Sequence, residues 1–374
     1  MEITVKKEEI VRALSTVLGV VEKRQTLPIL ANVLFEVDEN SFKLTATNLE
    51  SEVTVSLPLT TINSVGKITT SAQKLNELCR LFPDGEDINL SLNVDKLSVK
   101  TNNGKYSLST LQSADFPIFD IESANPPFII PAQELRELIT STTFVIPSVA
   151  LGRYETTGLF VSVGEGFITT AAVDRDNMAY ANLSKISDHT FSGIVPRKAV
   201  NEIAKLLSDQ SGDAGLKIND DSLELTVGNI VFKSKLIAGN FPDFRRAIPS
   251  GESSTLEVNV KDFSDSLSRV SVLKSELHKP IRLTTSSDGV RIMSSNTLLQ
   301  EQAEEFFPAA YNGDAIDWAF NVKLLQDIIS HIKTETCHLN FFGTTSSCLI
   351  ASPNSDSPQY VVLPLADVPT EVDS

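Results

Sequence analysis

The side chains best suited to chemistry are few and widely scattered in this 374-residue sequence. Cys79, Cys337 and Cys348 lie far apart and form no CxxC pair, a pattern that favours reduced thiols over a disulfide framework or a zinc site. The four histidines form no ligand pattern with these cysteines. The motifs GxGxxG, GxxxxGK[ST], HExxH and GxSxG are all missing, so the chemistries that depend on them are not indicated. We therefore expect no catalytic residue, no bound metal and no cofactor.

Charged residues offer two further kinds of site. The stretch Asp174-Arg175-Asp176 has carboxylates that suit a divalent cation, although an exposed acidic turn is the interpretation we favour. The net charge of −16 argues at first sight against a nucleic-acid partner, because phosphate binding needs local positive charge. The distribution of charge along the chain therefore has to be examined together with its elements.

Three similar sets of elements are expected to position these residues. Phe116-Pro117 recurs 125 residues later as Phe241-Pro242. Strands with alternating polar and apolar residues are expected at residues 105–111, 231–236 and 359–365. Each set has an earlier and a later amphipathic helix, expected at residues 7–21 and 72–82, 132–144 and 197–208, and 261–273 and 322–333. Ser71 and Asn321 suit helix N-caps, and Pro196 suits the first turn of a helix.

The repeat predicts an α+β fold of three tandem copies of one domain, each a sheet with helices on one face. Polar, proline-bearing stretches at residues 123–127 and 249–254 fit linkers, so we place the domains at residues 1–122, 126–249 and 253–374. The N-terminus lacks the apolar run of a signal peptide, and no stretch approaches the roughly 20 apolar residues that span a bilayer. We expect a cytoplasmic protein that does not contact a membrane.

The charge of the chain is unevenly divided between these helices and the rest. The six expected helices hold 12 basic and 9 acidic side chains, whereas the remaining residues hold 20 and 39. A helical layer that faces DNA would need this sign of charge, and an acidic exterior would repel DNA from the other surfaces. A general excess of Lys and Arg in helices explains the same count, so both interpretations stay open.

Segments from all three copies resemble the bacterial DNA sliding clamp family, the beta subunits of DNA polymerase III. They are residues 24–34, 44–50, 109–117, 194–198, 234–246, 319–322 and 360–364. The resemblance implies a head-to-tail homodimer, in which two chains of three domains close into a ring with helices lining the hole and sheets forming the outer collar. Such a heterologous interface avoids forming a filament only because its rotation closes.

The resemblance also implies an interface between the two copies. Its first-domain side comprises Lys74, Lys105, Tyr106 and Leu108, and its third-domain side comprises Val272, Leu273, Glu301 and Glu304. Each side thus has an apolar pair with charges opposite to those of the other side. Tyr106 and Leu108 also suit ordinary strand positions.

Within the ring, the resemblance implies weak contacts with duplex DNA that carry no sequence information. The expected contact residues are Arg24, Arg153, Tyr154, Arg197 and Lys198. Each of them also suits a solvated surface position. The implied partners are duplex DNA, a second copy of the chain, a clamp loader, the replicative DNA polymerase and other proteins that carry a clamp-binding motif.

These partners are expected to insert short apolar peptides into a pocket between the second and third domains, where a few side chains dominate binding. The expected pocket residues are Thr156, Val173, Met178, Pro242, Arg246, Ala247, Asn321, Ser346, Val361, Leu363 and Leu365. Val361 taken alone suits a core position. The sequence departs from the family at Asp174-Arg175-Asp176-Asn177, at Thr156, at Ala247 and in an acidic tail, residues 366–374. We hypothesise that peptide preference is altered or that affinity is reduced.

Three alternatives remain beside a housekeeping clamp. A specialised second-copy clamp with altered partner binding would account for the departures around the pocket. A repetitive β-rich surface or adhesion protein would account for the acidic balance, but the missing secretion signal and the six regularly placed helices count against it. An enzyme is the weakest alternative, because no catalytic motif is found.

Overall fold

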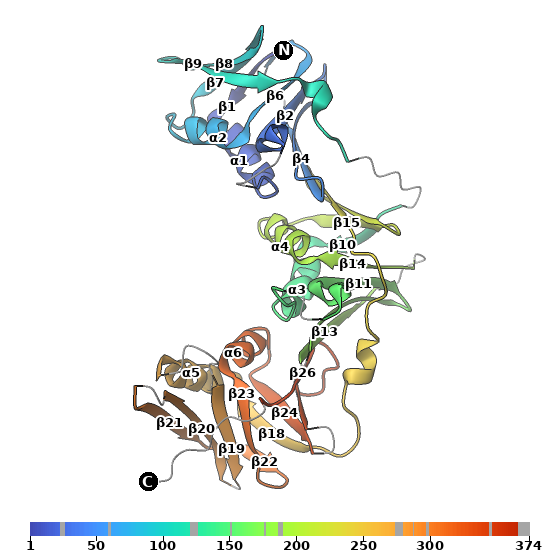
Figure 1. Ribbon diagram of the computed structural model, residues 1–374, viewed down its shortest axis with the longest axis vertical. Helices are drawn as coiled ribbons and strands as arrows, with labels where there is room; N and C mark the ends of the chain where they lie inside the picture. The colour runs from blue at the N-terminus through green and yellow to red at the C-terminus, as the bar shows by residue number, and fades with distance from the viewer. Residues whose placement is uncertain are drawn as a thin grey trace. The chain divides into compact units, whose positions relative to one another are not determined.

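The computed structural model describes residues 1–22, 27–58, 61–119, 126–149, 152–175, 177–185, 190–273, 280–286, 288–296, 299–343 and 346–365. Arg24, Asp176 and the tail at 366–374 lie outside these ranges. The chain divides into two compact units. Unit 1 comprises Met1–Arg136 and Lys198–Ile237, and unit 2 comprises Glu137–Arg197 and Ala238–Ser374 (Figure 1).

Unit 1 is built on one antiparallel sheet, whose strands lie in the order β10-β15-β16-β17-β4-β3-β2-β6-β9-β8-β7-β1-β5. The strands are β1 (Glu2–Lys6), β2 (Asn32–Val37), β3 (Phe42–Thr47), β4 (Ser51–Leu57), β5 (Thr61–Ser64), β6 (Gly66–Ser71), β7 (Asp87–Asn93), β8 (Lys96–Lys100), β9 (Lys105–Leu111), β10 (Phe128–Pro131), β15 (Asp213–Ile218), β16 (Ser222–Val227) and β17 (Ile230–Lys235). The short 3-10 helices η1 (Pro28–Ala31) and η2 (Ser113–Asp115) lie in its loops.

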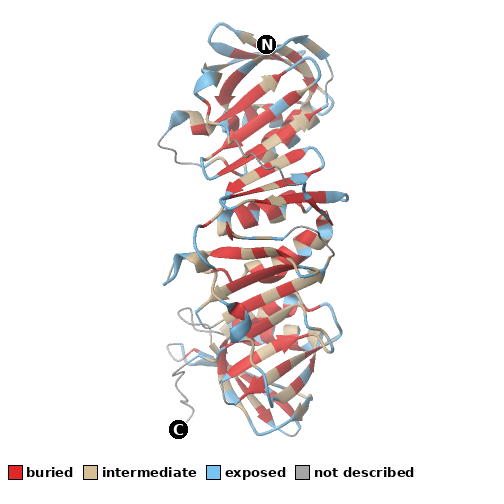
Figure 2. Cartoon of the chain, turned by 90° about the vertical axis from the view of Figure 1, so that its right-hand side faces the viewer, coloured by how far each residue is buried: buried red, intermediate tan, exposed pale blue. Residues whose placement is uncertain are grey.

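Two helices of unit 1, α1 (Lys7–Val17) and α2 (Ala72–Arg80), pack side by side, and α1 lies against β3 and β4 (Figure 1). Helix α1 buries Ile10, Leu14 and Val17, which recur at the three- and four-residue spacing of one helix face. Most of α4 (Arg197–Leu206) also belongs to this unit. Buried residues alternate with half-buried or exposed residues along several of the strands, as expected when one face of a sheet is covered (Figure 2).

Unit 2 has a nine-stranded sheet in the order β14-β11-β12-β13-β26-β25-β24-β18-β22 and a four-stranded sheet in the order β21-β20-β19-β23. The strands are β11 (Gly158–Gly164), β12 (Phe167–Asp174), β13 (Asn177–Ser184), β14 (Phe191–Pro196), β18 (Ser254–Asn259), β19 (Pro280–Ser286), β20 (Gly289–Asn296), β21 (Glu301–Phe307), β22 (Ala310–Asn312), β23 (Asp317–Asn321), β24 (Thr336–Phe342), β25 (Ser347–Ala351) and β26 (Gln359–Val362). Helices α5 (Val260–Val270) and α6 (Val322–Ser330) pack together.

The element order confirms the predicted α+β fold with three tandem copies. In each copy a strand and a helix precede a group of strands, and a second helix precedes three final strands. Helices α1, α3 (Ala132–Thr143) and α5 are the first of each pair, and α2, α4 and α6 are the second. The extra short strands β5 and β22 occupy matching places in the first and third copies and pair with β1 and β18.

The ends of several expected helices were wrong, although their starts were within a residue. Helix α1 ends at Val17 instead of residue 21, and α5 ends at Val270, where the 3-10 helix η5 (Ser271–Leu273) continues the chain. Pro196 is the last residue of β14 and precedes α4, so it does not lie in the first helical turn as predicted. The other two predictions are confirmed, since Ser71 Oγ accepts from Lys74 N–H and Asn321 Oδ1 accepts from two N–H groups of α6.

Candidate functional site

Four side chains form a continuous apolar row across neighbouring strands of unit 2. Val173 on β12 pairs with Met178 on β13, Met178 pairs with Val361 on β26, and Val361 pairs with Leu349 on β25. Met178 and Val361 are almost fully buried, at 2% and 3% exposure. Because residues at paired positions project from the same face of a sheet, this apolar row makes a contiguous floor. It brings together Val173, Met178 and Val361, as the expected pocket requires.

An aromatic cluster packs against the apolar row. Phe244, in the 3-10 helix η4 (Phe244–Ala247), is buried against Met178 and Val361. Its ring centroid lies 5.4 Å from that of Tyr180 and 5.9 Å from that of Phe160. Phe160 in turn stacks on Phe241 at 5.2 Å. The rings hold η4, and with it Arg246 and Ala247, beside the row.

This aromatic cluster was not among the predicted site residues. Phe241 and Phe244 flank Pro242 at a spacing of three residues, which is the one local signal that pointed to it. Phe160 and Tyr180 lie far away in sequence, and only the register of β11, β12 and β13 brings both of them to Phe244.

The rim of the row carries exposed and partly exposed groups. Leu363 and Leu365 follow β26 with 37% and 38% exposure, so their side chains remain available to a partner. The backbone N–H of Leu365 donates to the carbonyl of Ala319 at 2.8 Å, which fastens this segment to β23. Arg246 is ion-paired with Asp243 at 2.9 Å, and Ala247 is exposed. Thr156, in the 3-10 helix η3 (Tyr154–Thr157), directs its Oγ1 to the Arg153 carbonyl at 2.9 Å.

Asn321 and Ser346 are not among the residues of the buried cluster. Asn321 Oδ1 accepts from the backbone N–H groups of Lys323 at 2.9 Å and Leu324 at 3.3 Å, so this oxygen caps α6. Ser346 lies in the turn before β25 with a positive φ of 46°, and it is exposed. In the departing stretch at 174–177, Asp174 pairs with Asn177 across a β12–β13 turn, in which Arg175 has a φ of 41°.

The expected DNA-contact residues lie at element ends. Arg153 and Tyr154 are exposed at the start of η3 in unit 2, and Arg197 opens α4. Lys198 Nζ is 2.9 Å from Glu22 Oε1, and this hydrogen bond raises the pKa of Lys198. The ammonium is thus partly neutralised by a carboxylate that the sequence did not indicate. Arg24 lies outside the described residues.

The expected interface residues lie on or beside two sheet edges with opposite charges. On β9, residues 105–108 pair only with β8 among the described residues, and Lys105 and Tyr106 are exposed, as is Lys74 on α2. Leu108 is half-buried there. Strand β21 pairs only with β20 in the described part of the chain and exposes Glu301 and Glu304. Such edges present unpaired backbone groups that can accept a further strand.

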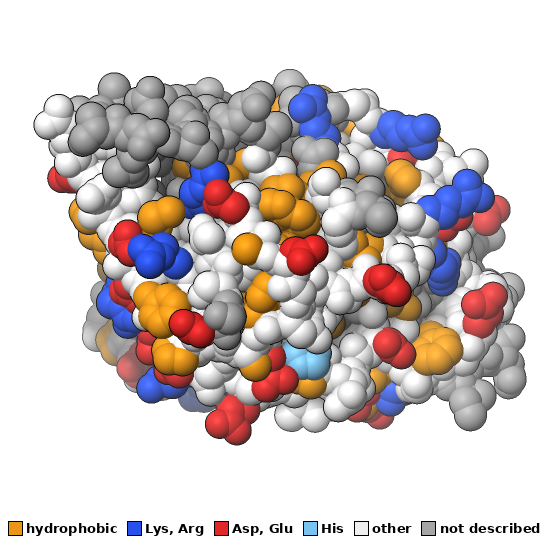
Figure 3. All heavy atoms as spheres, turned by 90° about the horizontal axis from the view of Figure 1, so that it is seen from below, with side chains coloured by type: hydrophobic (Ala, Val, Ile, Leu, Met, Phe, Trp, Pro, Cys, Tyr) orange, Lys and Arg blue, Asp and Glu red, His pale blue; other side chains and the backbone are white. Residues whose placement is uncertain are grey.

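The surroundings of the β21 edge are mixed in character. Val272 is 77% exposed and Leu273 is partly exposed, both in η5. Glu304 is ion-paired with Arg291, and the hydrogen bond from Arg269 lowers the pKa of Glu305. The face in Figure 3 shows charges of both signs interspersed with apolar side chains.

The cysteines are placed as inert core residues. All three thiols are buried, and burial raises the pKa of Cys79 and of Cys337 to about 12. Thiolates, the reactive form, are therefore scarce at neutral pH.

Among the described residues no group of three or more His, Cys, Asp or Glu side chains is placed to hold a metal ion. The described helices include none that is long and apolar enough to cross a membrane.

Known proteins match the chain along nearly its whole length. The family models for the N-terminal, central and C-terminal domains of the DNA polymerase III beta subunit match residues 1–120, 129–243 and 245–366. A beta sliding clamp from Pseudomonas aeruginosa is 34% identical over 367 residues, which cover 98% of this chain and 100% of the relative.

Solved structures agree with these matches. A crystal structure of the DNA polymerase III subunit beta from Pseudomonas aeruginosa has a TM-score of 0.92 and 33% identity, covering 98% of this chain and 100% of the other. A DnaN sliding clamp from the same organism, bound to griselimycin, has a TM-score of 0.92 and 34% identity, covering 98% and 99%.

The threefold α+β repeat and the three family matches define a DNA-clamp protein, a class that binds and tethers without catalysing a reaction. The chain belongs to the DNA polymerase III beta subunit family, the beta sliding clamps. The resemblance found in the sequence is therefore confirmed, and the enzyme and adhesion alternatives are dropped.

Proposed function

We propose that two copies of this chain join head to tail into a closed ring that encircles duplex DNA in the bacterial cytoplasm. In this role a clamp loader places the ring on DNA, and the ring tethers the replicative polymerase. A closed ring retains DNA by topology, so it needs only transient phosphate contacts. Strong sequence-specific contacts would instead stop sliding.

The observation that supports ring closure is a pair of open strand edges in the described part of the chain, at residues 105–108 of β9 and along β21. The β9 edge exposes Lys105, Lys74 of α2 is exposed as well, and the β21 edge exposes Glu301 and Glu304. An edge of one copy that pairs with the other edge of its neighbour satisfies backbone groups that otherwise risk aggregation. The opposite charges favour this pairing over two like edges meeting.

The test of closure measures mass and retention together. Native mass spectrometry should give about twice the chain mass of 40.7 kDa. After loading by the cognate loader, the protein should stay on circular DNA and leave linear DNA rapidly. The double variant Lys74→Glu/Lys105→Glu should shift the mass to that of a monomer and abolish retention, whereas Lys43→Glu, an exposed lysine on β3, should not. Equal retention on circular and linear DNA contradicts a topological mechanism.

The contacts with DNA are proposed for Arg24, Arg153, Tyr154, Arg197 and Lys198. Lys198 is expected to contribute least, since Glu22 already accepts from its ammonium at 2.9 Å. The check is the salt dependence of binding to linear duplex, whose slope should fall more in Arg197→Gln than in Lys198→Gln. Equal slopes in both variants and the native protein remove these two residues from the contact surface.

We propose that the apolar row and its rim bind the short peptides of partner proteins. Buried floor residues with two exposed leucines beside them offer an apolar surface that a partner side chain can cover. Thr156 and Ala247 make the rim more polar and shallower than a leucine and a valine would, which favours an altered peptide preference and the specialised-copy alternative. A relative described as bound to griselimycin supplies a ready probe.

Calorimetry of griselimycin with the full protein tests this site. Leu363→Gln should weaken binding at least tenfold, because it places an amide on the apolar rim. Leu299→Gln is the matched control, since Leu299 is a 65% exposed leucine between β20 and β21. Thr156→Leu and Ala247→Val should strengthen binding if those positions set the preference. Undiminished binding to Leu363→Gln excludes the apolar row as the site.

A further inference from the structure

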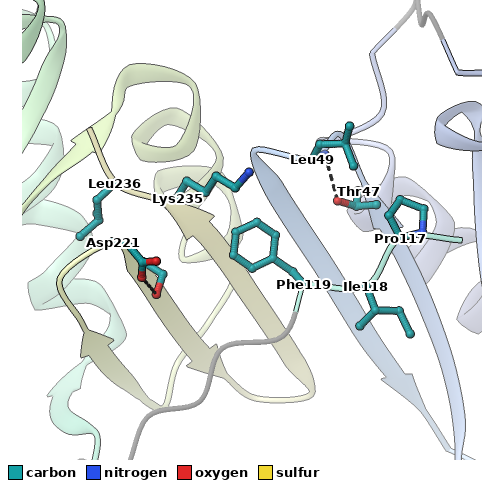
Figure 4. Close-up of a pocket in the computed structure, with 9 residues that line it drawn as sticks. Thr47, Leu49, Pro117, Ile118, Phe119, Asp221, Lys235 and Leu236 are labelled. Atoms are coloured by element: carbon teal, nitrogen blue, oxygen red, sulfur yellow. Dashed lines mark hydrogen bonds between the residues drawn. The ribbon is translucent and has the colours of Figure 1, made fainter. Parts of the chain in front are cut away.

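Unit 1 contains a cavity of about 560 Å³ that none of these roles uses. Its lining residues are Thr47, Leu49, Pro117, Ile118, Phe119, Asp221, Ser222, Lys235 and Leu236. Figure 4 shows the Phe119 ring between Lys235, at the end of β17, and Leu49, which follows β3. The first copy of the repeat thus supplies one side of the cavity and the second copy supplies the other.

Strand register shows that this cavity corresponds to the apolar row of unit 2. Thr47 pairs with Glu52 as Val173 pairs with Met178. Glu52 pairs with Lys233 as Met178 pairs with Val361. The correspondence places Lys235 at the position of Leu363.

Two further correspondences complete the match. Pro117 corresponds to Pro242 through the repeated Phe-Pro pair, and the same offset of 125 residues relates Asp221 to Ser346. The cavity therefore shares four positions with the peptide pocket expected in unit 2.

The strand positions of unit 1 that correspond to the apolar row lie next to the cavity lining in register and differ from the apolar row in chemistry. Glu224, Lys233 and Glu52 replace Leu349, Val361 and Met178, and we call them, with Lys217, the charged row. Lys217 Nζ lies 3.3 Å from Glu224 Oε1, and Lys233 Nζ lies 3.9 Å from Glu52 Oε1. Since these groups are charged and paired, unit 1 has no counterpart of the apolar surface that Met178 and Val361 form in unit 2.

The described lining of the cavity holds one cation, one carboxylate and several apolar groups. The carboxylate, Asp221, accepts from the Ser222 hydroxyl at 2.9 Å. Lys235 is exposed, and its Nζ lies 5.7 Å from the centroid of the Phe119 ring. In the described part of the chain its ammonium has no carboxylate within ion-pair distance, so it can accept an anionic group from outside. Leu49 and Ile118 are 41% and 60% exposed, so apolar surface lies close to the cation.

We propose that this cavity is a second peptide-docking site, which binds a short extended partner segment with a carboxylate against Lys235 and an apolar side chain against Leu49 and Ile118. Only the class of ligand rests on the proposed peptide site of unit 2. The charge of Lys235 selects an acidic segment, whereas Leu363 at the corresponding position selects an apolar one.

Methyl NMR of the full protein tests the proposal with two reporters. The δ1-methyl of Ile118 reports on the cavity, and the ε-methyl of Met178 reports on the apolar row. The probe is acetyl-Asp-Leu-Phe-amide, and acetyl-Asn-Leu-Phe-amide is its neutral control. The acidic probe should shift the Ile118 signal, with three- to fivefold weaker binding to Lys235→Gln and for the neutral probe, as expected for one exposed ion pair. Lys43→Gln, an exposed lysine on β3, should bind the acidic probe as the native protein does.

The result that overturns the proposal is an unmoved Ile118 signal at millimolar probe, or equal binding to the native protein and Lys235→Gln. A shift of Ile118 with a short DNA duplex but not with the peptide also overturns it, because the cavity would then take nucleic acid. The Met178 signal separates the two sites, since a failure of the peptide site in unit 2 leaves that signal unmoved whatever Ile118 does.

Discussion

Each unit contains one junction between successive copies of the repeat, and the two junctions share a register but differ in chemistry. In unit 2 the apolar row lies beneath Phe244, whose ring is buried against Met178 and Val361. In unit 1 the charged row lies beneath Phe119. Here the backbone of Phe119, and not its ring, makes the contacts with the row. Phe119 N–H donates to Glu52 Oε2 at 2.8 Å, and Lys233 Nζ donates to the Phe119 carbonyl at 2.8 Å.

The comparison teaches how one backbone arrangement serves two purposes. An apolar floor is stabilised by burial and can also be covered by a partner, because its contacts are non-directional. A charged floor must pair its groups, since buried charges without partners cost several kcal/mol. Glu52 and Lys233 therefore fasten the segment at Phe119, whereas Leu363 and Leu365 leave the rim of the other junction open.

The largest effect on stability is expected when a charged residue of the unit 1 junction is placed at the corresponding apolar position of the unit 2 junction. Met178→Glu puts the counterpart of Glu52 at a site that is 2% exposed and has no cation across the strand. The free energy of unfolding of unit 2 should fall by about 3–5 kcal/mol, because an ionised carboxylate is left unpaired. Chemical denaturation measures this loss. Met178→Leu is the control and should cost less than about 1.5 kcal/mol.

Much of the fold was predictable from the sequence, because the period of the repeat and the amphipathic helices are local patterns. The helix ends were less predictable, as the early end of α1 at Val17 shows, since apolar residues continue past it to Val21. The pairing of Glu52 with Lys233 was not predictable, because it depends on the register of β4 and β17 from different copies. Phe160 and Tyr180 were missed for the same reason, and the roles of the residues that were expected at the sites stay predictions.

The next largest effect on stability tests whether Glu52 and Lys233 act together as an ion pair. Glu52→Leu leaves Lys233 without its carboxylate and Phe119 N–H without its acceptor, so stability should fall by about 2–3 kcal/mol. The double variant Glu52→Leu/Lys233→Leu imitates the apolar row and should recover only the part of this loss that comes from the unpaired ammonium, because the Phe119 N–H and carbonyl stay without their side-chain partners. Urea titration of the two variants gives the comparison. A double variant that is less stable than Glu52→Leu argues that Lys233 is held mainly by Phe119.

A smaller effect compares the matching helices α6 and α2. Asn321 Oδ1 accepts from two N–H groups at 2.9 and 3.3 Å, whereas Ser71 Oγ accepts from one at 3.4 Å. Asn321→Ala should therefore cost about 1 kcal/mol and Ser71→Ala about 0.5 kcal/mol. Thermal unfolding measures both. If Asn321→Ala is neutral in stability but weakens griselimycin binding, Asn321 acts as a pocket residue and its capping role is minor.

The smallest effect concerns the pH dependence of the charged row. Burial raises the pKa of Glu52 above its ordinary value of 4.5, while the Phe119 N–H and the charge of Lys233 oppose the rise. Between pH 4.5 and the raised pKa the folded protein holds more protons at this group than the unfolded chain does. Stability in this window must therefore fall as pH rises. Urea midpoints of the native protein should decline across the window relative to Glu52→Gln, whose amide does not titrate. A parallel course of the two curves would show that the bonds from Phe119 and Lys233 cancel the desolvation completely, which makes the charged row as insensitive to pH as its apolar counterpart.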